Sequence, residues 1–260
     1  MSDEKSLKYN EPWILQRADP YVYRHTDGSY YFTASVPAYD GIVLRRAGTL
    51  AELSGAEEVM VWKKHESGPM SYHIWAPEIH YLFGKWYIYF AGGEAEDIWK
   101  IRPYVLECSG DDPLTDEWVE LGKMKRAAED EFSFEAFSLD ATVFENKGEY
   151  YYVWAEKVGV GKMISNLYIA KMESGNQLKT VQVLLTTPDY DWERKGFWVN
   201  EGPAVIHHDG KMFLTYSASE TGVDYCVGML SIDEDADILD PRLWKKERYP
   251  VLKTLSLIHI

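Results

Sequence analysis

Cysteine is nearly absent from this sequence, which has only Cys108 and Cys226 among its 260 residues. Two cysteines cannot build a disulfide framework or a zinc ribbon. Long apolar runs are missing too, because no stretch reaches the roughly 18 apolar residues that a membrane helix needs. Residues 1–6 contain no apolar leader. The sequence therefore predicts a protein without a membrane segment that is located in the cytoplasm.

Basic residues are also in short supply. The chain has 27 Lys and Arg against 42 Asp and Glu, so its formal net charge is −15. Such a field repels phosphate backbones and anionic membrane surfaces, which argues against nucleic acid or membrane as a partner. A neutral oligosaccharide is compatible with this charge. The sequence carries no prediction of the oligomeric state.

Several familiar catalytic signatures are missing. His65 is followed by no second histidine at the spacing of a zinc protease, and there is no Gly-rich phosphate loop, Gly-x-Ser-x-Gly elbow or Cys-x-x-Cys pair. The sequence therefore predicts no organic cofactor and no metal site. Two more histidines, His73 and His80, lie near Trp75 in the sequence, as His65 does. All three could reach a pocket at Trp75, but we favour surface or core positions for them.

What the sequence does contain is an internal repeat of about sixty residues. Each copy has an acidic residue at or near its start, then an apolar run, a polar turn with glycine and an aromatic-rich strand. The acidic positions are Asp19, Glu78, Asp140 and Glu201, and the turn glycines are Gly28, Gly84, Gly148 and Gly210. A fixed period of this kind is typical of a repeated supersecondary unit.

The local pattern of each repeat predicts β-strands. Aromatic residues, which favour strands, make up 15% of the chain. The pairs Asp27-Gly28 and Asp209-Gly210 are hairpin turn signals. Further strands are expected at 42–45, 104–108, 166–171 and 225–230, and short helical turns at 112–115 and 240–243. About four strands per repeat is the content of one propeller blade, so we expect an all-β propeller.

The end of the chain departs from this pattern. Residues 255–260 can be encoded by a common transposon-based sequencing adapter, so we expect them to be a non-native tail. Residues 1–254 are then a single propeller domain with about four blades present. We expect the gene model to be truncated, with a further blade largely missing.

The repeated acidic residues are the candidates for chemistry. Strands nearest the axis of a propeller end in a shared funnel, so Asp19, Asp140 and Glu201 could meet around one ligand. Glycoside hydrolysis needs such a set, in which one carboxylic acid protonates the leaving oxygen and a second carboxylate activates water or attacks directly. The alternative is that acidic residues recur only as structural turn formers.

Four ordered motifs give this set a family resemblance. Ala18-Asp19-Pro20-Tyr21, Trp75-Ala76-Pro77-Glu78, Ser138-Leu139-Asp140-Ala141 and Asn200-Glu201-Gly202-Pro203 resemble the signature motifs of glycoside hydrolase family 43. The resemblance covers roughly residues 10–250. It implies a five-bladed propeller that acts on α-L-arabinofuranosides or β-D-xylosides with inversion.

The resemblance also implies roles for single residues. Asp19 is similar to the general base that activates water, Glu201 to the general acid, and Asp140 to the residue that orients this acid and raises its pKa. Trp75 resembles an aromatic wall of the sugar site. Glu78 has no counterpart among the three catalytic acids, so we expect a structural or outer-pocket role for it.

The expected substrate is an oligosaccharide with α-L-arabinofuranosyl ends, as in plant arabinan or arabinoxylan. This choice rests on the likeness of residues 64–75 to arabinofuranosidase-like members. A β-xylosidase, an endo-arabinanase and a non-catalytic propeller that binds sugars or proteins remain alternatives. The family's fifth blade brings an arginine and, in some members, a histidine near a calcium ion. Both would lie beyond residue 260, so a structural calcium is expected only in a longer protein.

Overall fold

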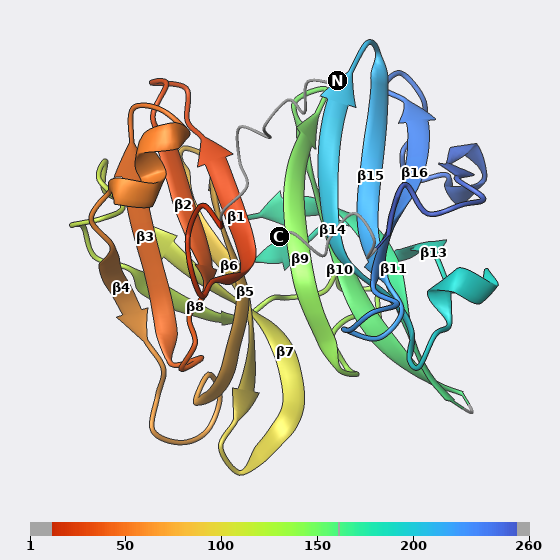
Figure 1. The fold of residues 1–260 in the computed structure, drawn as a ribbon, viewed down its shortest axis with the longest axis horizontal. Coiled ribbons are helices and arrows are strands. Elements are labelled where there is room, and N and C mark those ends of the chain that lie inside the picture. The colour runs from red at the N-terminus through yellow and green to blue at the C-terminus, as the bar shows by residue number, and fades with distance from the viewer. Residues whose placement is uncertain (1–11, 161, 254–260) are drawn as a thin grey trace, which may run out of the picture.

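The computed structural model describes residues 12–160 and 162–253 (Figure 1). Strands dominate these residues, as the sequence predicts. In chain order they are β1 Ala18–Arg24, β2 Tyr30–Ser35, β3 Gly41–Ala47, β4 Val59–Lys63, β5 Tyr72–Leu82, β6 Lys85–Glu94, β7 Asp97–Cys108, β8 Val119–Lys123, β9 Ser138–Asn146, β10 Glu149–Val160, β11 Lys162–Ser174, β12 Gln177–Leu178, β13 Val183–Thr186, β14 Trp198–His208, β15 Lys211–Ala218, β16 Cys226–Asp233, β17 Lys245–Lys246 and β18 Leu252–Lys253.

The helical part of the described chain is limited to three short 3-10 helices, η1 Ala51–Gly55, η2 Asp191–Glu193 and η3 Pro241–Leu243. None of the helices in the described part could span a bilayer, since each is too short and too polar. The expected non-native tail at 255–260 lies outside the described residues. The all-β prediction is therefore confirmed.

The strands fall into four antiparallel groups that follow the chain, β1–β4, β5–β8, β9–β13 and β14–β18. The first two groups are separate sheets. The last two are joined, because Ile164 and Ser165 of β11 pair in parallel with Trp198 and Val199 of β14. Hydrogen bonds thus define three sheets among the described residues, and the number of blades stays a prediction. In Figure 1, β1 to β8 fill one half of the molecule and β9 to β16 the other.

The turn glycines close the first hairpin of each group. In three groups the turn has two residues, Phe83-Gly84, Lys147-Gly148 and Asp209-Gly210, and both residues have positive φ. Turns of this type match the right-handed twist of the strands they join, which is why glycine recurs there. The turn at Gly28 is longer, because the last pair of β1 and β2 is Arg24 with Tyr30.

The middle strands are buried on both faces. Trp86 and Ile88 of β6 pack towards the first sheet, while Tyr87 and Tyr89 pack towards β9–β12. The same alternation occurs in β10, where Trp154 faces one core and Val153 the next. A strand with two covered faces has no polar side, so these segments read as continuous aromatic and apolar runs rather than as alternating ones.

The first strands of the four groups lie next to one another: β1 contacts β5, β5 contacts β9, and β9 contacts β14. Each contains a β-bulge whose central residue has a positive φ, namely +49° at Asp19, +45° at Ala76, +49° at Asp140 and +56° at Gly202. A bulge bends the strand and re-aims a side chain. The sequence repeat is therefore anchored on these four residues.

This register changes one expectation from the sequence. Asp19 and Asp140 occupy equivalent bulge positions, but Glu201 precedes the bulge residue of its strand and is equivalent to Trp75. Glu78 lies two residues past Ala76. The predicted equivalence of the three acids therefore holds for the two aspartates only. Glu201 reaches the shared centre from a different position of the repeat.

Replacing Gly228 by alanine should destabilise the fold. A Cβ at this position of β16 would overlap the ring of the buried Tyr216. Overpacking of this kind costs about 1–3 kcal/mol. Gly222→Ala is the matched control, because a Cβ there meets no heavy atom within 4 Å. Denaturant unfolding should show a lower midpoint for Gly228→Ala alone, and equal midpoints for the two variants would contradict this packing.

Candidate active site

The ends of the inner strands border a cavity of about 830 Å³. All four residues singled out from the sequence lie on its wall: Asp19, Trp75, Asp140 and Glu201. The other lining residues are Ala18, Tyr39, Phe137, Leu139, Lys157, Gly196, Phe197, Trp198, Val199, Ser219, Glu220, Thr221 and Tyr225. Residues from three of the four repeats thus supply the three acids to one space.

Asp19 is held by the neighbouring strands. The Oγ of Ser35, the last residue of β2, donates a hydrogen bond to Asp19 Oδ2 over 2.8 Å. The same Oγ accepts a hydrogen bond of 2.8 Å from the backbone N–H of Ala76, the bulge residue of β5. One hydroxyl therefore ties the first acid to the second strand. Asp19 itself is exposed to solvent, so water can reach its free oxygen.

Asp140 and Glu201 are linked through the bulge of β14. Asp140 Oδ2 accepts a hydrogen bond of 3.2 Å from the backbone N–H of Gly202, the residue after Glu201. The Tyr225 hydroxyl donates to Glu201 Oε1 over 3.1 Å. The first contact fixes the backbone next to Glu201. The second orients its carboxyl group and leaves the other oxygen available to carry a proton.

The two inner acids hold their protons to higher pH than ordinary carboxyl groups. Burial is the main cause that raises the pKa of Asp140 well above its usual value, and the charges of Glu201 and Asp19 raise it further. Burial also raises the pKa of Glu201, against the opposing effects of Tyr225 and Lys157. Pairs of carboxyl groups with raised pKa values are typical of sites that donate protons near neutral pH.

Lys157 is the cation of the cavity wall. Its Nζ lies 3.8 Å from the centroid of the Phe137 ring. Burial lowers its pKa, while the charge of Glu201 acts in the opposite direction. A cation in this place partly offsets the negative charge that the three acids concentrate in the cavity.

Trp75 belongs to an aromatic group beside the acids. The His73 ring lies tilted against the Trp75 ring with centroids 4.2 Å apart, Tyr39 meets it edge-on at 6.0 Å, and Trp99 lies at 6.3 Å. Trp75 is half-buried, so part of its ring stays open towards the cavity. Such a ring can stack on the apolar face of a sugar.

Glu78 does not line the cavity. Its Oε2 lies 2.9 Å from Nε2 of the buried His80, whose Nδ1 is 3.4 Å from the Tyr21 hydroxyl. Burial raises the pKa of Glu78. Glu78 therefore has a structural role, which is one of the two roles expected for it from the sequence.

The three histidines near Trp75 take different places. His80 is in the core, and His65 pairs with Glu120 at the surface over 2.8 Å. His73 is half-buried against Trp75, and burial lowers its pKa. Within residues 12–160 and 162–253, no three His, Cys, Asp or Glu side chains are grouped so that they could hold a metal ion.

Three contacts in the site were not predicted from the sequence. Ser35, Lys157 and Tyr225 each touch or face an acid, yet none belongs to a repeated motif. Ser35 is the last residue of the aromatic-rich strand β2 and Tyr225 precedes β16, and neither position stands out in the printed sequence. Only the folded strands bring them to the cavity.

Comparison with known proteins places this geometry in a family. The sequence matches the family model described as Glycosyl hydrolases family 43 over residues 9–257. It is 48% identical over 249 residues to a protein of Streptomyces avermitilis named extracellular exo-α-(1→5)-L-arabinofuranosidase, covering 96% of this chain and 50% of that protein. A protein of the same name from Streptomyces chartreusis is 47% identical, over 94% of this chain and 72% of its own length.

Solved structures show the same likeness. The crystal structure of an α-L-arabinofuranosidase from Lactobacillus brevis has a TM-score of 0.84 and 52% identity, and the match covers 92% of this chain and 75% of that one. An endo-arabinase from Bacteroides thetaiotaomicron has a TM-score of 0.67 at 14% identity, over 92% of this chain and 82% of that one, and so shares the fold alone.

One prediction from the sequence is wrong. The two Streptomyces relatives are named extracellular enzymes, which contradicts the cytoplasmic location expected here. The low cysteine count was a poor basis for predicting the location, because apolar cores between the sheets hold this fold together and its two described cysteines are free. Residues 1–6 lie outside the described residues.

The chain spans about half the length of the Streptomyces avermitilis relative. On the match to the family model over residues 9–257, this chain belongs to glycoside hydrolase family 43.

Proposed function

We propose that this chain carries the catalytic machinery of an inverting, exo-acting α-L-arabinofuranosidase. The observation that supports this function best is the meeting of Asp19, Asp140 and Glu201 on one cavity wall, with raised pKa values at Asp140 and Glu201. The oligosaccharide that this cavity would take is neutral, which fits a protein of net charge −15.

The proposed reaction is a single displacement. Asp19 takes a proton from water as the water oxygen forms its bond to the anomeric carbon. The bond from that carbon to the leaving oxygen breaks on the opposite face of the sugar, and Glu201 gives its proton to that oxygen. Asp140 holds the Gly202 amide next to Glu201. Burial, with the charge of Asp19, raises the pKa of Glu201, so that Glu201 arrives protonated.

The choice of arabinose rests on the relatives. Proteins that are 44–48% identical to this chain, and a solved structure at 52%, are named arabinofuranosidases. A β-xylosidase of Bacillus halodurans and the Bacteroides endo-arabinase share the fold at 16% and 14% identity. At such low identity they give no support for a particular substrate of this chain. β-Xylosidase and endo-arabinanase activities remain the alternatives that the assays below separate.

Removing either the acid or the base should abolish hydrolysis. We expect Asp19→Asn to lower kcat/KM by about 10²–10⁴-fold on both 4-nitrophenyl α-L-arabinofuranoside and an α-1,5-linked arabinobiose, the range that one proton-transferring group contributes. Glu201→Gln should cause a loss of this size on the arabinobiose, because its leaving alcohol needs a proton. Glu129→Gln, an exposed residue outside the cavity, is the control and should keep the full rate. The assay uses the full natural protein, with the β-D-xyloside run in parallel.

The other outcomes are equally clear. Release from the xyloside alone would assign a β-xylosidase, and release only from the interior of an arabinan chain would assign an endo-acting enzyme. A folded protein that binds arabinan but hydrolyses none of these substrates would be a binding propeller. NMR of the first product should show inversion at the anomeric carbon, and retention would overturn the role of Asp19 as the base.

Truncation of Trp75 should weaken substrate binding more than chemistry. We expect Trp75→Ala to raise KM about tenfold or more, since stacking on an aromatic face contributes on the order of 1–2 kcal/mol. Phe132→Ala is the control, because Phe132 is 69% exposed and does not line the cavity. If KM stayed unchanged, Trp75 would be a packing residue and not a sugar wall.

The cavity acids should make the fold less stable as pH rises. Folding raises the pKa of Asp140, so the native state binds more protons than the unfolded state, and the free energy of unfolding falls from about pH 4 upwards. Asp140→Asn removes this loss. We expect its Tm to exceed that of the parent at pH 7.5, by roughly 2–4 °C for each kcal/mol, with a smaller gain at pH 4.5.

Asp240 supplies a control of the opposite sign. Hydrogen bonds from Arg242 lower its pKa to about 2, so its contribution to stability is present above pH 4 and lost as pH falls towards 2. Asp240→Asn should therefore lower Tm at pH 7.5. A Tm gain for Asp140→Asn that did not change with pH would show that charge is not its cause.

A further inference from the structure

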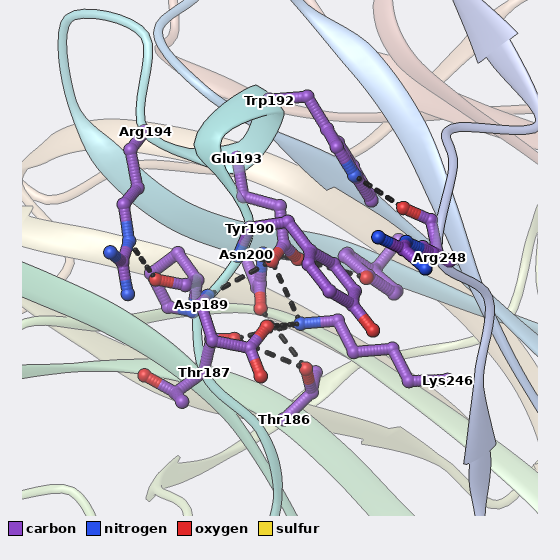
Figure 2. Close-up of polar contacts among 12 residues, drawn as sticks. Thr186, Thr187, Asp189, Tyr190, Trp192, Glu193, Arg194, Asn200, Lys246 and Arg248 are labelled. Carbon is purple, nitrogen blue, oxygen red and sulfur yellow. Dashed lines mark hydrogen bonds and ion pairs between the residues drawn. The ribbon is translucent and has the colours of Figure 1, made fainter.

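A second polar cluster lies outside the cavity wall, around a fully buried acid (Figure 2). Glu193, in the 3-10 helix η2, has 0% of its surface exposed. Its carboxylate accepts five hydrogen bonds. The donors are the backbone N–H groups of Asp189 (2.9 Å) and Tyr190 (2.8 Å), Asn200 Nδ2 (2.9 Å), the Tyr216 hydroxyl (2.9 Å) and Lys246 Nζ (2.8 Å).

Lys246 brings the compensating charge from the far end of the chain. It lies on β17, 53 residues after Glu193, and only 14% of its side chain is exposed. Its Nζ also donates to the Thr187 carbonyl over 2.8 Å and to Asp189 Oδ1 over 2.5 Å. A buried carboxylate with no cation is costly, so the ion pair is needed once Glu193 is buried.

Asn200 connects this cluster to the cavity. It is fully buried and immediately precedes Glu201 on β14. Side chains of a strand alternate, so Asn200 faces Glu193 while Glu201 faces the cavity. The Asn200 amide also donates to the Val199 carbonyl over 3.0 Å and accepts from Thr186 Oγ1 over 3.3 Å. Its position along the strand is therefore held from several sides.

The same cluster anchors one wall of the cavity. The segment 187–197 connects β13 to β14, and its last residues, Gly196 and Phe197, line the cavity. Trp192 Nε1 donates to the Arg248 carbonyl over 3.0 Å, close to Lys246 in the chain (Figure 2). Lys246 and Arg248 thus fix the segment 187–197 by hydrogen bonds.

We propose that Glu193 and Lys246 are positioning residues for the acid Glu201, acting through Asn200. This inference rests on the proposed function. Neither residue lines the cavity. Their ion pair locks the Asn200 side chain, and with it the backbone from which Glu201 reaches the Tyr225 hydroxyl. A displacement of about 1 Å in a reacting group is enough to cost roughly 10²-fold in rate.

The leaving group supplies a readout that a merely structural role would not change. A nitrophenolate leaves with little help from an acid, whereas a sugar alcohol needs the proton of Glu201. If Glu201 is misplaced, hydrolysis of an α-1,5-linked arabinobiose must suffer more than hydrolysis of 4-nitrophenyl α-L-arabinofuranoside. Loss of folded protein would reduce both rates by the same factor.

The test compares Lys246→Met with the parent on both substrates, using the full natural protein. We expect kcat on arabinobiose to fall about tenfold more than kcat on the nitrophenyl substrate, within the range that general acid catalysis contributes. KM should change less than about threefold, since no substrate contact is removed. Lys246→Arg, which keeps the charge, should restore part of the rate.

Lys245→Met is the matched control. It is the same substitution one residue earlier on β17, where the Lys245 side chain is 76% exposed and forms an ion pair with Glu247. It should leave both rates unchanged. If Lys246→Met fails to fold, the double variant Glu193→Gln/Lys246→Met removes both charges together, and it should show the same difference between substrates.

Equal losses on the two substrates, or no loss on either, would overturn the positioning role and leave the proposed function intact. A parent protein that hydrolyses neither substrate would overturn the proposed function, and the inference with it.

Discussion

Four residues with a left-handed backbone conformation on the inner strands determine how this molecule is organised around its centre. An ordinary strand would send alternate side chains to its two covered faces, where they would be buried in the cores between the sheets. The bulges at Asp19, Ala76, Asp140 and Gly202 interrupt that alternation in the N-terminal half of each inner strand. Aspartate and glycine tolerate positive φ better than most residues, so three of the four positions carry a residue suited to this backbone. At Asp19 and Asp140 the same residue also supplies an acid to the cavity.

Concentrating acids in one cavity works against folding, and the structure offsets that cost locally. Asp140 has a backbone amide, Glu201 has a tyrosine hydroxyl and a nearby lysine, and Asp19 has a serine. None of these partners is a full counter-charge in direct contact. Burial, together with this remaining charge imbalance, keeps the pKa values of Asp140 and Glu201 high. A site of this kind trades stability for a proton that can be donated.

Much of the fold could be predicted from the sequence because it depends on local rules that repeat. The glycines at 84, 148 and 210 mark two-residue turns, and the aromatic runs after them mark strands buried on both faces. The motif residues Asp19, Trp75, Asp140 and Glu201 could be assigned to one cavity for the same reason. The repeat also suggested that the acidic positions are equivalent. Glu201 and Glu78 do not occupy the bulge position of their strands, and only backbone dihedral angles reveal this.

The rest could not be predicted, because it depends on contacts between distant and unrepeated positions. Nothing distinguishes Glu193 from the other acidic residues of a chain that has 42 of them, and Lys246 is one of two adjacent lysines. Their roles follow from burial and from the chain folding back over 53 positions to bring Lys246 to Glu193. The parallel pairing of β11 with β14, which fuses two groups of strands into one sheet, likewise follows from tertiary packing and not from any local signal.

The ion pair between Glu193 and Lys246 also sets an order of events during synthesis. The ribosome delivers Glu193, Asn200 and Glu201 well before Lys246, and domains begin to fold from their N-terminal side as they emerge. Until β17 docks, the Glu193 carboxylate has no cation and the strand that bears Glu201 is not locked. A nascent chain therefore contains all three cavity acids for some time before Lys246 can pair with Glu193 and fix the strand that bears Glu201.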